Sequence, residues 1–172
     1  MRPLRRCTLL TAAFLIPSLV SAQQRGIEIG LDGGLQYLLE SRILVIAVPF
    51  QRVRAAFPSG QRLAFEPALA LTRISRDGVA LTSFALEVGA LYTFVPARAN
   101  TYIRPFVGLE YVHDSFSGGS HAFDLGFGVG TRSPLADRLA LRIEANVTGR
   151  FPEGGGTDGL LGATVGLSFF TR

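Results

Sequence analysis

The stretch SFALEVGALYTF, residues 83–94, indicates the fold of the whole chain. Every second residue from Phe84 to Phe94 is apolar, and the residues between them include Glu87, Gly89 and Thr93. This period of two is typical of a β-strand with one apolar face, because successive side chains of a strand point to opposite faces. The stretch therefore predicts a strand that is apolar on one side only.

The same alternation returns along most of the chain. It recurs in seven further segments, at residues 27–36, 43–57, 63–72, 103–111, 123–130, 139–147 and 161–169. Segments rich in turn-forming residues separate them, at residues 39–42, 58–60, 76–78, 96–100, 113–120, 133–137 and 152–158. None of these connections is long enough for a crossover helix, so each strand is expected to pair with its sequence neighbours. The prediction is an all-β, eight-stranded antiparallel up-and-down β-barrel.

The N-terminal segment has the features of a secretory signal peptide. Arg2, Arg5 and Arg6 precede an apolar run that ends near Ala22 at small residues. We therefore expect a signal peptide at residues 1–22 and a single barrel domain at residues 23–172. Removal of the peptide takes 3 of the 17 basic residues and none of the 13 acidic ones, which leaves 14 − 13 = +1. A mature chain with so small a net charge offers no basic surface for phosphate groups, so we do not expect it to bind nucleic acid.

Alternation alone does not say which face of the sheet looks outward. A soluble, lipocalin-like periplasmic binder would turn its apolar face inward, whereas a transmembrane barrel turns it toward lipid. The polar faces here carry small residues and isolated charges instead of the dense charge of a soluble surface. Several predicted strands are also about 10 to 12 residues long, near the roughly 9 to 11 residues that cross a membrane. These features favour the transmembrane barrel, with the soluble binder as an alternative.

The isolated charges have both signs, as an enclosed lumen requires. An eight-stranded barrel is just wide enough to be filled by its own side chains, so a wide porin-like channel is not expected. The predicted lumen charge network consists of Glu28, Asp32, Arg52, Arg54, Glu66, Glu87, Arg104, Glu110, Asp124, Arg142 and Glu144.

Two stretches carry a resemblance to a known family. Residues 62–71, RLAFEPALAL, and residues 137–144, DRLALRIE, resemble strands of the outer-membrane β-barrel domain family, typified by the OmpA and OmpX transmembrane domains, as they leave short periplasmic turns. The resemblance covers residues 26–172. It implies a Gram-negative cell envelope, location in the outer membrane, and contact with outer-membrane lipid and lipopolysaccharide.

The last predicted strand is similar to the assembly signal of that family. Thr164, Gly166 and Phe169 have the matching spacing, although the chain closes on Thr171 and Arg172 where the family usually ends on an aromatic residue. The resemblance therefore implies recognition by the barrel-assembly machinery through this C-terminal strand.

One pair of residues has the types that nucleophilic catalysis uses. His113 and Ser115 faintly resemble the His-x-Ser of the outer-membrane lipid A deacylase family, in which the His activates the Ser. Phe116 stands where that family usually has Asn, and Asp124 has the parity of the inward face. A polar loop is the expected role of this segment, and a lipid A-modifying barrel esterase is the alternative.

No other constellation predicts chemistry. His121 is isolated, and no His, Cys or carboxylate cluster has metal-ligand spacing. The glycines at 126, 128 and 130 follow a strand pattern and do not form a phosphate-binding loop. We expect no metal, no cofactor and no enzymatic activity, and hence a small outer-membrane barrel with a structural or surface-interaction role.

Overall fold

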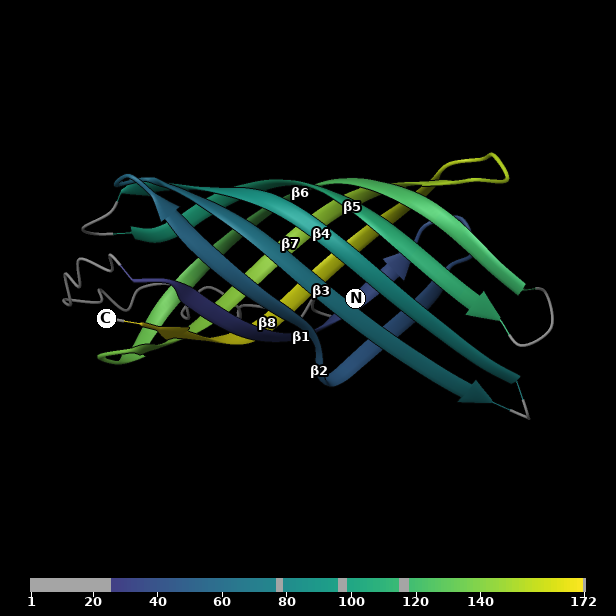
Figure 1. Cartoon of the computed structure of the whole chain (residues 1–172), viewed down its shortest axis with the longest axis horizontal. Coiled ribbons are helices and arrows are strands. Elements are labelled where there is room, and N and C mark those ends of the chain that lie inside the picture. Colours follow the sequence, from purple (N-terminus) through teal and green to yellow (C-terminus); the bar gives the residue numbers. More distant parts are fainter. Residues whose placement is uncertain (1–25, 77–78, 96–98, 115–117, 172) are drawn as a thin grey trace, which may run out of the picture.

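The computed structural model describes residues 26–76, 79–95, 99–114 and 118–171. They form eight β-strands, shown in Figure 1. These are β1 (Glu28–Leu38), β2 (Ile43–Ser59), β3 (Leu63–Arg76), β4 (Val79–Val95), β5 (Ala99–Asp114), β6 (Gly118–Ala136), β7 (Leu139–Pro152) and β8 (Asp158–Phe170). The predicted signal peptide at residues 1–22 lies outside the described residues, so the limits predicted for the barrel domain stay a prediction. Within the described residues, no helix is long and apolar enough to cross a membrane.

The strands close into a barrel in sequence order. Each is antiparallel to its neighbours, and β1 pairs with β8 along its whole length, from Glu28 opposite Phe170 to Leu38 opposite Leu160. The end that carries Gly26 and Thr171 also carries the β2–β3, β4–β5 and β6–β7 connections, and we call it the terminal end. The opposite end carries the other four connections and is called the loop end. The predicted eight-stranded up-and-down barrel is confirmed.

The strands are longer than the sequence predicted. They contain 11 to 19 residues, and predicted turns at 113–120 and 133–137 lie partly within strands, because β5 continues to Asp114 and β6 runs from Gly118 to Ala136. At about 3.3 Å per residue and a tilt near 40°, a 16-residue strand rises about 40 Å, more than the roughly 25 Å apolar band of a membrane barrel. The outer faces of strand ends beyond this band no longer meet hydrocarbon, so they need not be apolar.

The apolar faces of the strands point outward. Ile46, Leu71 and Leu109 expose 67%, 63% and 61% of their surface, whereas Arg54 and Glu66 expose 1% and 0%. A soluble barrel has the reverse arrangement, because charged side chains stay in water unless they are paired. The lipocalin-like alternative is therefore wrong, and the outer surface is that of a transmembrane barrel.

The register of the wall shifts at three places, near Thr93 in β4–β5, near Pro134 in β6–β7 and, with the largest insertion, in β2. Between the pairs Asp32–Arg52 and Gly34–Ala47 the β1–β2 register shifts, so that residues 48–51 of β2 stand opposite Gly33 alone. Beyond this bulge β2 stays paired with β1, but its ladder with β3 ends at the pair Arg52–Ala70. Figure 1 shows β2 bending away from β3 here, while β3 stays paired with β4 as far as Arg76. We call the separation between residues 48–51 of β2 and 71–76 of β3 the β2–β3 gap.

Candidate functional site

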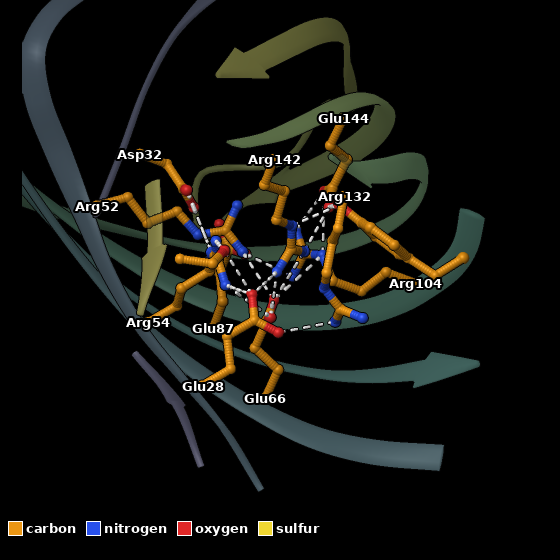
Figure 2. A network of polar contacts seen from close by, with 12 residues as sticks. Glu28, Asp32, Arg52, Arg54, Glu66, Glu87, Arg104, Arg132, Arg142 and Glu144 are labelled. Atoms are coloured by element: carbon orange, nitrogen blue, oxygen red, sulfur yellow. Dashed lines mark hydrogen bonds and ion pairs between the residues drawn. The ribbon is translucent and has the colours of Figure 1, made fainter. Parts of the chain in front are cut away.

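Ten charged side chains meet inside the terminal half of the barrel, as Figure 2 shows. Five are arginines and five are carboxylates, so their formal charges cancel. Nine of them were predicted for the lumen from strand parity, and Arg132 was not. We call this set the lumen network: Glu28, Asp32, Arg52, Arg54, Glu66, Glu87, Arg104, Arg132, Arg142 and Glu144.

Arg54 joins the network to the seam between β1 and β8. Its Nε donates to both carboxylate oxygens of Asp32, at 2.8 and 3.1 Å, and its Nη1 donates to Glu28. Its Nη2 donates to the Ser168 hydroxyl at 2.6 Å, and this hydroxyl donates to Glu28 at 2.7 Å. Arg132 of β6 reaches Glu28 from the other side, at 2.9 Å. One fully buried guanidinium thus links β1, β2 and β8 by charge-assisted hydrogen bonds.

Arg142 lies at the centre of the network. Its two Nη atoms donate to both carboxylate oxygens of Glu66, and Nη2 also donates to Glu144 at 2.6 Å. Its Nε donates to the Tyr102 hydroxyl, which in turn donates to Glu144 at 2.9 Å. The guanidinium groups of Arg132 and Arg142 also lie 4.9 and 4.6 Å from the centre of the Tyr102 ring, within cation–π range.

Arg104 and Arg52 complete the network on the side of the loop end. Arg104 donates to Glu144 at 3.0 Å through Nε and to Glu87 at 3.2 Å through Nη1. Arg52 lies 2.9 Å from the same Glu87 oxygen atom, so two arginines share one carboxylate. The Phe106 ring lies 4.2 Å from the Arg104 guanidinium carbon.

Glycines on neighbouring strands give these large side chains their room. A Cβ atom at Gly30 would lie 2.2 Å from the Arg54 guanidinium carbon, and one at Gly130 would lie 2.2 Å from the Tyr102 hydroxyl. A Cβ atom at Gly126 would lie 2.1 Å from the Phe106 ring. The alternate glycines of β6 therefore belong to the packing of the lumen.

The network fills the lumen with charge and is stable only as a whole. Arg54, Glu66 and Arg104 are buried to 99% or more, so each needs its partners to offset the loss of hydration. Removing one member of such a buried set leaves its partners uncompensated, at a cost of about 3 to 5 kcal/mol. The network is thus a plug of paired charges built from the wall itself.

A smaller cluster lies nearer the loop end. Arg150 of β7 pairs with Glu110 and lies 3.2 Å from Asp124, while the Ser83 hydroxyl donates to Glu110. The sequence predicted Glu110 and Asp124 for the same lumen network, but the structure groups these two residues with Arg150 instead. We call Glu110, Asp124 and Arg150 the rim triad.

Two cavities of about 90 Å³ each lie on either side of the plug. One, between the lumen network and the loop end, is lined by residues that include Arg52, Ala70, Glu87 and Arg104, and we call it the loop-side cavity. The other opens toward the terminal end, and its lining includes Glu28 and Arg132. The lumen network, which includes the fully buried Glu66 and Arg104, lies between the two.

The possible nucleophile site receives little support from the described residues. His113 is exposed on β5 opposite Gly119, and its ring stacks 6.5 Å from that of Tyr111. Ser115 lies outside the described residues. Asp124 points inward to Arg150, so it is not placed to orient His113. His121 lies beside Tyr111, and the described residues include no cluster able to hold a metal ion.

Sequence reasoning missed Tyr102, Arg132 and Arg150 for one shared reason. All three lie just beyond the predicted strands at 103–111, 123–130 and 139–147, because the observed β5, β6 and β7 continue past those limits. Continued to the observed strand ends, the same parity places each of them on the inward face.

Known proteins resemble this chain in structure alone. No family model and no curated protein matches it. Neisserial surface protein A superposes with a TM-score of 0.68 at 13% identity, over 85% of this chain and 97% of that one. OprG of Pseudomonas aeruginosa gives 0.53 at 8%, over 89% and 99%. The N-terminal β-barrel domain of OprF from the same organism gives 0.50 at 16%, over 85% and 98%. The chain has the fold of the small outer-membrane β-barrels.

Proposed function

We propose that this chain is a non-enzymatic outer-membrane protein of a Gram-negative bacterium, with a structural role in the cell envelope. Its continuous outward apolar surface supports insertion in a bilayer, since a soluble protein of this size does not leave so large an apolar surface in water. Lipid and lipopolysaccharide are the proposed partners of this surface. The barrel-assembly machinery is the proposed partner of β8, whose outward residues include Val165 and Phe169.

The lumen network is the observation that carries the structural role. A barrel that moves solutes needs an open path, whereas here Arg54, Glu66, Arg104 and Tyr102 are almost completely buried across the lumen. Ion pairs from seven strands join opposite sides of the wall, so the interior braces the barrel. The proposed function is therefore a closed, rigid membrane element.

Conductance tests the closed lumen directly. We expect the purified chain in planar lipid bilayers to give no stable channel, and vesicles that contain it to leak salt no faster than empty vesicles. A reproducible single-channel conductance from the unaltered chain would overturn the closed-lumen proposal. Gel mobility in SDS, with and without boiling, establishes beforehand that the sample contains folded barrels.

The structural role is tested in the bacterium itself. Cells without the chain should become more sensitive to SDS and to vancomycin, and the unaltered chain should restore resistance. The His113→Ala variant should restore it equally well, because a structural role does not need the imidazole. Failure of this variant, beside success of Arg138→Ala in an exposed turn, would favour the esterase instead.

A further inference from the structure

The cavity that opens toward the terminal end lies at the mouth of the barrel, and we call it the terminal-side cavity. Its lining comes from β1, β2, β3, β4, β6 and β8 and from the β2–β3 turn, all within the described residues. Glu28 and Arg132 of the lumen network line its inner part, and Gln61 and Arg62 line it from the turn. Gln61 and Arg62 are exposed, so the cavity is accessible from the solvent at this end.

Positive charge exceeds negative charge in this lining. It contains two arginines, Arg62 and Arg132, and one carboxylate, Glu28. The loop-side cavity, in contrast, is lined by two of each. Glu28 is also engaged already, because Arg54 and the Ser168 hydroxyl donate to one of its oxygens and Arg132 lies 2.9 Å from the other. The terminal-side cavity therefore favours an anionic ligand.

Arg132 provides a donor that is held in place before a ligand arrives. Its side chain keeps 13% of its surface, the most of any arginine in the lumen network. Its Nε is enclosed by the wall, and its Nη2 lies against Glu28, so Nη1 is the donor that the described contacts leave for a ligand. The Tyr102 ring, 4.9 Å from the guanidinium carbon, limits the rotation of the group. Such preorganisation lowers the cost of binding.

A second part of the lining is apolar and consists of short side chains. Ala56, Pro58 and Ala64 contribute to it, beside Phe170. The volume of about 90 Å³ exceeds the roughly 30 Å³ share of one water molecule. It is far below the roughly 300 Å³ of a pocket that encloses a whole drug-sized ligand. The cavity thus accommodates a carboxylate with a methyl group beside it, and leaves the rest of a ligand in solvent.

We propose that the terminal-side cavity binds the C-terminal carboxylate of a peptide that ends in alanine. Arg132 and Arg62 hold the carboxylate, and the methyl group lies against Ala56 and Ala64. The source of the peptide rests on the proposed function, because outer-membrane barrels turn their short connections, here residues 60–62 and 137–138, toward the periplasm. In the periplasm the stem peptides of the cell wall end in D-alanine.

The dipeptide N-acetyl-Ala-D-Ala is the probe, and its C-terminal amide is the matched control ligand. The full mature chain, labelled with nitrogen-15 and folded in detergent micelles, is titrated with each peptide while its amide resonances are followed by NMR. We expect saturable shifts around residues 60–64 with the acid and none with the amide.

Three variants test the two arginines in the same titration. Arg132→Gln should weaken binding about tenfold, as the loss of one charge-assisted hydrogen bond does. Arg62→Gln should weaken it about threefold, because water screens the charge of an exposed side chain. Arg138→Gln, in the exposed β6–β7 turn, is the matched control and should change nothing. Should Arg132→Gln fail to fold, Arg62→Gln still decides, since it alters only an exposed turn.

The site would be overturned by the absence of saturable shifts with the acid, by equal shifts with the amide, or by equal affinities of Arg62→Gln and Arg138→Gln. Displacement of the peptide by an equal concentration of inorganic phosphate would overturn its assignment to a peptide carboxylate. Tighter binding of N-acetyl-Ala-L-Ala would overturn the cell wall as the source and indicate protein C-termini.

Labelling in cells separates the site from the proposed location. Gln61→Cys should react with a maleimide too large for outer-membrane pores only after the outer membrane is permeabilised. Gly154→Cys, in the β7–β8 connection at the loop end, should react in intact cells. Reaction of Gln61→Cys in intact cells would overturn the periplasmic source of the ligand, whereas the titration in micelles tests the site independently of location.

Discussion

The terminal half and the loop half of this barrel differ in wall and in lumen together. In the terminal half every strand is paired on both sides, and the lumen holds five arginines and five carboxylates in mutual contact. In the loop half β2 has left β3, and the lumen holds a cavity and a triad with two carboxylates for one arginine. Each half also holds a cavity of about 90 Å³, so the halves differ in charge and pairing and not in free volume. Paired strands accompany a charge-balanced network, and the interrupted β2–β3 ladder accompanies an excess of carboxylates.

The largest effect is expected in the terminal half, from Arg142→Ala. The substitution removes the cation that Glu66, Glu144 and Tyr102 all contact, and leaves two carboxylates buried without it. We expect the free energy of unfolding to fall by about 3 to 5 kcal/mol. Urea unfolding in lipid vesicles, followed by gel mobility in SDS, measures it. A loss below 1 kcal/mol would mean that water already hydrates the network.

A second test of the filled lumen is Gly130→Ala. The added methyl group would lie 2.2 Å from the Tyr102 hydroxyl and 2.8 Å from the Ile143 carbonyl oxygen, so tightly packed groups must move. We expect a loss of about 1 to 3 kcal/mol in the same unfolding measurement. Gly154→Ala is the control, because a Cβ atom there meets nothing within 4 Å. Equal stability of the two variants would show that the lumen is loosely packed.

Arg150→Ala is the corresponding substitution in the loop half, and its effect on stability is compared with that of Arg142→Ala. Arg150 also contacts two carboxylates, but its side chain is 22% exposed, so water can replace part of what is lost. We expect a loss of about 1 kcal/mol or less, decreasing further in high salt. If Arg150→Ala were as damaging as Arg142→Ala, the difference between the two halves would not hold.

The smallest effect is a pH dependence at the loop end. The Asp158 carboxyl group beside Glu40 hydrogen-bonds to it and repels its charge, and both effects raise the pKa of Glu40. A raised pKa in the folded state means a contribution to stability that is present below the ordinary value of 4.5 and lost as the pH rises through the folded value. Glu40→Gln should therefore remove a small decrease in unfolding midpoint between about pH 4 and pH 7. Identical pH profiles for the two chains would contradict this.

The sequence predicted the barrel because lipid and lumen impose opposite demands on alternate residues. Parity placed residues such as Arg54, Glu66 and Arg142 on the inward face correctly, since a charge on the lipid face is strongly unfavourable. The alternation could not predict which of these charges pair with each other, because pairing depends on how the strands are staggered around the barrel. Glu66 contacts Arg142 across the lumen, 76 residues away in the chain.

The bulge in β2 was the feature that the sequence concealed. Residues 43–57 showed only an irregular alternation, and four residues of β2 opposite Gly33 alone explain why, since the parity is not kept through such an insertion. Only the pairing of both neighbours reveals that β3, which stays paired with β4, has no partner on its β2 side there. The alternation of residues describes a single strand, whereas the separation of β2 from β3 depends on how two strands pair.

The lumen network also has a consequence for how the barrel is assembled. Some of its pairs form within one hairpin, such as Arg54 with Asp32 in β1–β2 and Arg104 with Glu87 in β4–β5. The pairs Arg142–Glu66 and Arg132–Glu28 join strands that are not neighbours, so they form only when the cylinder closes. A strand that slipped by one residue would turn its charges into lipid, at about 2 to 4 kcal/mol for each arginine near the membrane centre. The charges of the lumen network therefore make the observed strand register more stable in a membrane than a register shifted by one residue.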